Sequence, residues 1–205
     1  MTNSLIDNAI EYVVTPAVNG SMVLDSASDL AKNYLNDSFN SKSDMVNSLI
    51  NWESSKNSAV GFITSLSGAL TIPAGIAGDL YASWVYQARM SAAIAYIYGY
   101  NLNDERVKTM VLLSIIGDAC KDALKQVGVE VCIKSAKSYI MKNISGAALR
   151  QINKNVGYRL FTKAGSKGII NIAKLVPCLG GVVGGSIDWF SCQTVGRIAK
   201  ELFAR

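Results

Sequence analysis

The residues best suited to acid–base chemistry are two aspartates, Asp118 and Asp122, which lie four positions apart beside Lys121 and Lys125. On a helix, this spacing places both carboxylates on one face, a pattern that is also typical of a solvated charged surface. The chain contains no histidine, so it lacks the usual general base, the commonest metal ligand and a standard member of catalytic triads. We therefore expect a protein that is not an enzyme and has no metal or cofactor, and we rank an enzyme built on the two aspartates third.

Two further acids stand alone in apolar surroundings, where an ionised carboxylate needs a partner. Each acid follows a proline and a row of small residues, and an arginine comes nine or ten positions later. Along the sequence, Asp79 is therefore followed by Arg89, and Asp188 by Arg197. Ten helical residues span about 15 Å, so Asp79 cannot reach Arg89 within one helix. If the two units pack with approximate two-fold symmetry, the buried pairs are Asp79 with Arg197 and Asp188 with Arg89. A proton or ion site is the alternative role of these acids.

Uncharged segments, 57–78 and 175–187, precede these acids. The first is long enough to span a bilayer, but it is polar and interrupted by Pro73, so a buried helical hairpin is favoured over a membrane-spanning helix. The second contains four glycines that place small residues four positions apart twice, a spacing that favours close helix packing. A phosphate-binding loop is excluded because neither the required lysine nor a preceding strand is present. The packing glycines are Gly180, Gly181, Gly184 and Gly185.

The charge is divided unevenly along the chain. Residues 1–120 contain 6 basic and 11 acidic residues, a net charge of −5, whereas residues 121–205 contain 14 and 4, a net charge of +10. No acid lies between Glu130 and Asp188, which favours contact with anionic lipid headgroups, nucleic acid or an acidic partner. The alternative is a solvated basic face, partly neutralised by the acidic half. The basic residues of this run are Lys134, Lys137, Lys142, Arg150, Lys154, Arg159, Lys163, Lys167 and Lys174.

Helical periodicity extends along the whole chain, and three prolines interrupt it, so we predict an all-α fold: a compact multi-helix bundle with two Gly/Pro-interrupted hydrophobic hairpins. The four cysteines form no C-x-x-C pair, which predicts free buried thiols, and the N-terminal residues do not form a secretory signal. A cytoplasmic protein is therefore expected. The clearest helices are predicted at about 5–14, ended by Thr15-Pro16, at 22–38, at 44–54, and from Asn103-Asp104-Glu105 to Gln126, ended by Gly128.

Ordered motifs between residues 45 and 205 carry a family resemblance. They include Gly61–Gly68, Gln87-Ala88-Arg89-Met90, Val156-Gly157-Tyr158-Arg159-Leu160, Lys174-Leu175-Val176-Pro177 and Gly196-Arg197. In this order they resemble the EcsC family of bacterial proteins, with Cys178 departing from the larger aliphatic residue expected after the proline. The resemblance implies one EcsC-like domain over 1–205, with N-terminal helices at 1–44 and a core at 45–205. It implies association with a membrane and transporters, and no established reaction.

From these features we expect a non-enzymatic helical protein at the inner face of the bacterial membrane, which binds anionic lipid or a membrane partner. The contact residues are predicted to be Lys154, Arg159, Lys163, Lys167 and Lys174. The alternative is a soluble interaction module that binds an acidic protein. Nucleic acid is not expected as a partner, because the basic run lacks a recognisable binding module.

Overall fold

The computed structural model describes residues 6–21, 24–57, 78–129, 133–166 and 182–204, and for Asp79, 133–135, 162–166 and 182–187 it describes the helical backbone alone. Helices account for most of this part of the chain, which contains no strand beyond one isolated bridge between Ser21 and Leu24. The predicted all-α class is confirmed. The elements are the π-helix η1 (Ile10–Val14), α2 (Thr15–Asn19), α3 (Ala27–Leu35), α4 (Lys42–Asn57), α6 (Gly78–Ile97), α7 (Glu105–Ile115), the 3-10 turn η2 (Gly117–Ala119), α8 (Cys120–Lys125), α9 (Ile133–Asn143), α10 (Gly146–Ser166) and α12 (Val182–Phe203).

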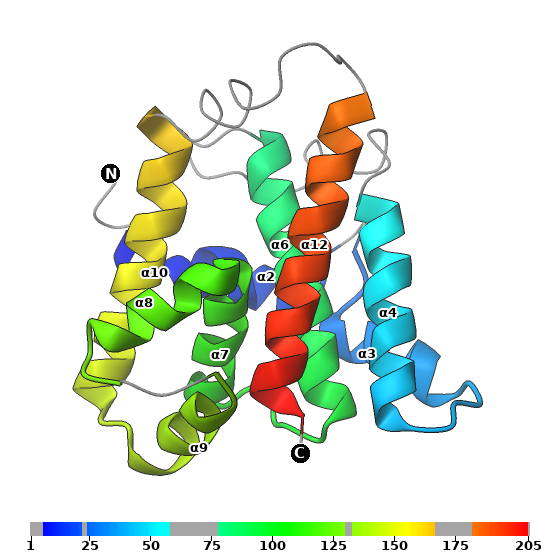
Figure 1. The fold of residues 1–205 in the computed structure, drawn as a ribbon, viewed down its shortest axis with the longest axis horizontal. Coiled ribbons are helices and arrows are strands. Elements are labelled where there is room, and N and C mark those ends of the chain that lie inside the picture. The colour runs from blue at the N-terminus through cyan, green and yellow to red at the C-terminus, as the bar shows by residue number, and fades with distance from the viewer. Residues whose placement is uncertain (1–5, 22–23, 58–77, 130–132, 167–181, 205) are drawn as a thin grey trace.

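Helix α6 lies at the centre of the bundle, with α2, α3, α4, α7 and α12 packed around it (Figure 1). Every residue from Tyr81 to Ala95 is buried. A helix that is covered on all sides needs apolar or small residues around its whole circumference. This explains why α6 lacks the polar stripe of a surface helix.

Helices α6 and α12 run in the same direction through the middle of the molecule (Figure 1). Their register is fixed by Gln87, whose Nε2 donates to Ser191 Oγ at 3.2 Å, and by Cys192 Sγ, which lies 3.7 Å from Met90 Sδ. On one side of this pair lie α3 and α4, and on the other lie α8, α9 and α10 (Figure 1). The two sides therefore contain different parts of the sequence, 24–57 and 120–166.

Several helix boundaries differ from the predictions for physical reasons. The first helical stretch continues through Pro16 to Asn19, because proline is tolerated in the first turn of α2. Helix α7 is capped by Asp104, whose side chain accepts from the backbone N–H of Arg106. The long helix predicted to reach Gln126 is broken at Gly117, where φ is 58°. Gly128, with φ of 78°, follows the end of α8 as predicted.

The predicted hairpins fall mostly in 58–77 and 167–181, outside the described residues, and so do Gly180 and Gly181. Gly184 and Gly185 lie in the backbone of α12, and what surrounds them is outside the described part as well. None of the helices among the described residues combines the length and the hydrophobicity needed to cross a bilayer.

Two other glycines serve close packing. At Gly196 in α12, a Cβ atom would lie 2.7 Å from Cγ1 and Cγ2 of Ile50 in α4. At Gly157 in α10, a Cβ atom would collide with the backbone carbonyl oxygen of Ile6 and lie 3.0 Å from Cβ of Ala9. Both glycines therefore allow a helix to approach its neighbour more closely than any other residue would.

Candidate functional site

Arg89 is buried as predicted, and its ion-pair partner is Glu53 of α4. Arg89 Nη2 lies 2.8 Å from Glu53 Oε2, with side-chain exposures of 6% and 0%. The hydroxyl of Tyr86 donates to the same oxygen, and Lys56 Nζ lies 2.8 Å from Glu53 Oε1. Burial, and then the charge of Glu53, raises the pKa of Tyr86, so the phenol stays protonated. The carboxylate is thus held from three directions inside the core.

The sequence pattern predicts Asp188 as the partner of Arg89, whereas in the structure the guanidinium pairs with Glu53. The pattern compared only the two glycine-rich units, but α4 packs against both α6 and α12 and brings its own acid into the core. Asp188 contributes its backbone carbonyl, which accepts from Asn57 Nδ2 at 3.3 Å.

The predicted burial of Arg197 is wrong. Its side chain is 49% exposed, and it pairs with Asp118 at 2.8 Å and with Glu201 at 3.2 Å. Helices α6 and α12 are parallel, and Gln87 lies beside Ser191. Measured along the helix axes from this contact, Asp79 lies about 12 Å toward one end and Arg197 about 9 Å toward the other. The predicted pair of Asp79 with Arg197 is therefore wrong. The side chain of Asp79 is outside the described part of the structure.

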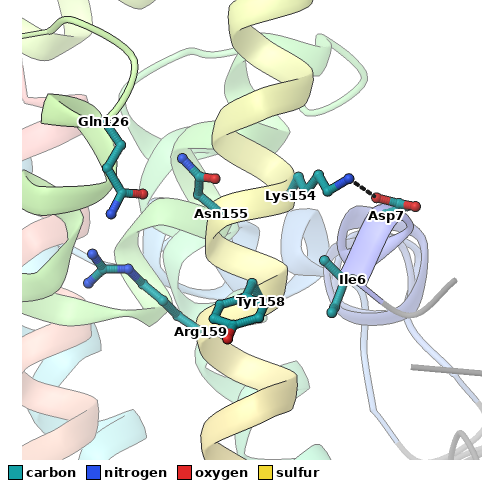
Figure 2. Close-up of a pocket in the computed structure, with 7 residues that line it drawn as sticks. All are labelled: Ile6, Asp7, Gln126, Lys154, Asn155, Tyr158 and Arg159. Atoms are coloured by element: carbon teal, nitrogen blue, oxygen red, sulfur yellow. Dashed lines mark ion pairs between the residues drawn. The ribbon is translucent and has the colours of Figure 1, made fainter. Parts of the chain in front are cut away.

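The strongest candidate for a functional site is a groove along α10. Seven residues line a cavity of about 480 Å³: Ile6, Asp7, Gln126, Lys154, Asn155, Tyr158 and Arg159 (Figure 2). At Gly157, α10 packs closely against the short N-terminal helical segment that contains Ile6, and α8 packs against α10 from the other side. Two of the predicted contact residues, Lys154 and Arg159, are therefore brought into one groove.

Within the groove, the two cations point to opposite sides of Tyr158 (Figure 2). Lys154 points toward Asp7, and Arg159 points toward the side of Gln126. The ring of Tyr158 lies between them and is 59% exposed, one of the few large hydrophobic side chains that are exposed in the described residues. The groove therefore combines two cations, one acid, two amides and an aromatic ring at the surface.

The ion pairs of the groove are long. Lys154 Nζ lies 3.6 Å from Asp7 Oδ1, and both side chains are more than half exposed. Arg159 Nη1 lies 3.8 Å from Asp122 Oδ2 and 3.4 Å from the carbonyl oxygen of Ala119. Exposed ion pairs contribute about 0–1 kcal/mol. An external anion therefore meets little competition for these cations.

The groove lies among helices that are rich in basic residues. Between residues 120 and 161, seven described side chains are basic and one, Asp122, is acidic. The basic ones are Lys121, Lys125, Lys137, Lys142, Arg150, Lys154 and Arg159. Three predicted contact residues are not placed: the side chain of Lys163, and the whole of Lys167 and Lys174, lie outside the described residues.

Two acids meet α10: Asp7, which the sequence did not single out, and Asp122, which it singled out for acid–base chemistry but not as a partner of Arg159. Asp7 comes from the N-terminal turn and Asp122 from α8, and neither lies in the acid-free part of the sequence. The opposite net charges of the two halves indicated that some acids would lie beside these cations, because an acidic half folds against a basic one. The pairing itself depends on tertiary contacts.

Asp118 and Asp122, the pair considered for acid–base catalysis, have different partners. Asp118 lies in η2, where its hydrogen bond with Arg197 lowers its pKa below the ordinary value. Asp122 lies in α8 and faces Arg159. Both are about two-thirds exposed. The two carboxylates lie in different elements, the 3-10 turn η2 and helix α8, and they face arginines of two different helices.

Cys120 and Cys192 are free and buried. Burial raises the pKa of Cys120 to about 11 and that of Cys192 to about 12, so both thiols stay protonated and unreactive. Cys132 and Cys178 lie outside the described residues. Over the part of the chain that the structure describes, His, Cys, Asp and Glu side chains form no group of three that could hold a metal ion.

Comparisons of the chain with protein-family models, with curated proteins and with solved structures found no match. The resemblance to the EcsC family therefore stays a prediction.

Proposed function

We propose that this protein binds peripherally to an anionic membrane surface through the side formed by α8, α9 and α10, and that it acts by binding rather than by catalysis. The observation that carries the proposal is the charge of α8, α9 and α10, whose described side chains include seven basic residues and one acid, Asp122; Asp7 adds a second acid at the groove. Each basic residue near an anionic membrane contributes about 1 kcal/mol to binding. The EcsC resemblance, also a proposal, adds the inner face of a bacterial membrane.

Tyr158 supports a lipid surface over an acidic protein as the partner. Its ring is 59% exposed and lies between Lys154 and Arg159. Tyrosine is enriched at membrane–water interfaces, where its ring contacts the acyl boundary and its hydroxyl stays among headgroups. Cations beside such a ring would contact lipid phosphates at the same depth.

Flotation with vesicles tests the proposal. Vesicles of phosphatidylcholine with phosphatidylglycerol should retain the protein at low salt and release it near 1 M salt, where the Debye length falls to about 3 Å. Vesicles of phosphatidylcholine alone should retain little. Equal binding to both kinds of vesicle would overturn the electrostatic proposal.

A pair of double variants locates the contact surface. Arg150→Gln with Lys154→Gln removes two exposed charges from α10 and should weaken vesicle binding about thirtyfold, at about 1 kcal/mol per charge. Lys32→Gln with Lys42→Gln removes the same charge from the α3 and α4 side and should change binding much less. Equal losses would place the contact elsewhere. Binding to polyglutamate but to neither kind of vesicle would favour the soluble interaction module.

A further inference from the structure

One end of the groove brings three polar side chains together, an arrangement that general attraction to an anionic surface does not need. The side chains of Gln126, Asn155 and Arg159 come from two elements, the end of α8 and the middle of α10, and lie on the same side of α10 (Figure 2). Lys154 points to the other side. Three polar groups that line one cavity can surround a single ligand group.

Arg159 is the anchored member of this cluster. Its side chain is 19% exposed, and Nη1 donates to the carbonyl oxygen of Ala119 at 3.4 Å. A guanidinium has five N–H donors, so this bond leaves donors for a ligand. The nearest competitor, Asp122, is 68% exposed and lies 3.8 Å away, a distance longer than a hydrogen bond.

Asn155 is held in the orientation of a donor. Gln151 Nε2 donates to Asn155 Oδ1 at 2.8 Å, and this contact leaves both N–H groups of Asn155 Nδ2 to donate. Gln126 follows α8 as its C-cap residue and has an exposed side chain that lines the same cavity. The cluster can therefore supply N–H donors from three side chains and one full positive charge.

We propose that this cluster binds a phosphomonoester group. Donors from three separate side chains match a tetrahedral anion with three free oxygens better than a planar carboxylate or a phosphodiester, each of which has two. Arginine suits such groups because its fork donates to two oxygens at once. The cavity of about 480 Å³ has room for the attached organic group beside Tyr158 and Ile6. This inference rests on the proposed membrane function for its location and sharpens it by naming the headgroup.

The test compares two anionic lipids at equal surface charge. Vesicles of phosphatidylcholine with phosphatidic acid, a phosphomonoester, should bind the protein about tenfold more tightly than vesicles with phosphatidylglycerol, a phosphodiester, as expected for one additional charge-assisted hydrogen bond. Arg159→Lys keeps the charge but loses the fork, so it should bring this ratio close to one. The matched control is Arg150→Lys, an exposed residue of α10 that does not line the cavity. The control should keep the preference.

Asp122→Asn provides a gain of binding, which a folding defect cannot imitate. Removal of the acid 3.8 Å from Arg159 should raise affinity for phosphatidic acid vesicles several-fold. Asp29→Asn, which removes an acid from α3 that is also more than half exposed, controls for net charge and should have a smaller effect. A wild-type ratio of one, with binding to phosphatidylglycerol intact, would overturn the inference and leave the proposed function standing.

A calorimetric titration with inorganic phosphate separates a lipid from a soluble source. Saturable phosphate binding that Arg159→Lys abolishes, without binding to any vesicle, would support the phosphate site, assign it to a soluble phosphate ester and overturn the membrane function. Preference for phosphatidic acid together with release by inorganic phosphate at constant ionic strength would support both proposals. No binding of phosphate or of any anionic vesicle would overturn both.

Discussion

Glu53 with Arg89 and Asp122 with Arg159 are both carboxylate–guanidinium pairs, but they differ in distance and in contact with solvent. The first pair lies in the core at 2.8 Å, with exposures of 0% and 6% for the acid and the base. The second lies at the groove at 3.8 Å, with exposures of 68% and 19%. In the core, both members depend on each other because no water replaces a lost partner. At the groove, water or an external anion can replace the acid, so the arginine there is available for binding.

The largest effect is expected from Glu53→Leu. This change leaves Arg89 buried without its partner, which typically costs about 3–5 kcal/mol of the free energy of unfolding. Replacing Arg89 by Met in the same chain should recover much of the loss, because a buried pair replaced by apolar residues is often nearly neutral. Urea denaturation of the two single variants and the double variant measures this. Additive losses would contradict the coupling of the two residues.

A smaller effect is expected at Gly196, where α12 meets α4 on the core side. Gly196→Ala places a Cβ atom 2.7 Å from Ile50, and such overpacking costs about 1–3 kcal/mol. The control is Gly146→Ala at the start of α10, where a Cβ atom would meet only Arg150 Nη1 at 3.7 Å. The control should be neutral or slightly stabilising in thermal denaturation. Equal stability of both variants would show that α4 and α12 can separate at little cost.

Asp104 and Arg106 form a pair that is intermediate in exposure. Their atoms lie 2.6 Å apart, and the hydrogen bond from Arg106 lowers the pKa of Asp104, the N-cap of α7. An acid whose folded pKa lies below its unfolded value of about 3.9 stabilises the fold above that pH, and this stability is lost as the pH falls through the folded pKa.

We therefore expect the free energy of unfolding to fall by about 1 kcal/mol below pH 4 as this cap is protonated. Asp104→Asn keeps a good capping residue without the titration, so its stability should depend less on pH between 4 and 2. The comparison requires denaturation curves at several pH values. Identical pH profiles for the variant and the wild type would contradict the role of Asp104.

The smallest effect on stability is expected at the groove itself. Asp122→Asn removes a long, exposed ion pair and should change the free energy of unfolding by less than about 1 kcal/mol. The same variant is expected to bind anionic vesicles more tightly. Loss of stability as large as that of Glu53→Leu would remove the distinction between the core pair and the groove pair.

The sequence predicts the fold class well because helix formation is largely local. Short stretches of sequence are enough to recognise the features that define the helices. Examples are the apolar circumference of α6, the acids at the start of α7 and the glycine after α8. Helix ends were less predictable at Pro16 and Gly117, since each residue is compatible with either continuing or ending a helix.

Pairing between distant residues was predicted poorly. The sequence singled out Arg89 as a charge that needs a partner, but not Glu53, because α4 also contains Asp44 and Lys56 and nothing distinguishes its buried acid from acids on a solvated helix surface. It also identified Lys154 and Arg159 as cations of a basic run. It did not place Gln126 or Asn155 beside Arg159, since amides carry no charge or periodicity that marks them. Those neighbours follow from how α8 and α10 pack.

The parallel arrangement of α6 and α12 has a consequence for the order in which the protein folds. The contact between Gln87 and Ser191 joins residues 104 positions apart, and that between Asn57 and Asp188 joins residues 131 positions apart. Such contacts require the closure of long loops, which slows folding relative to bundles with local contacts. During synthesis, α4 and α6 emerge long before α12, so their flank stays uncovered until then. That flank is where we expect chaperones to engage the nascent chain.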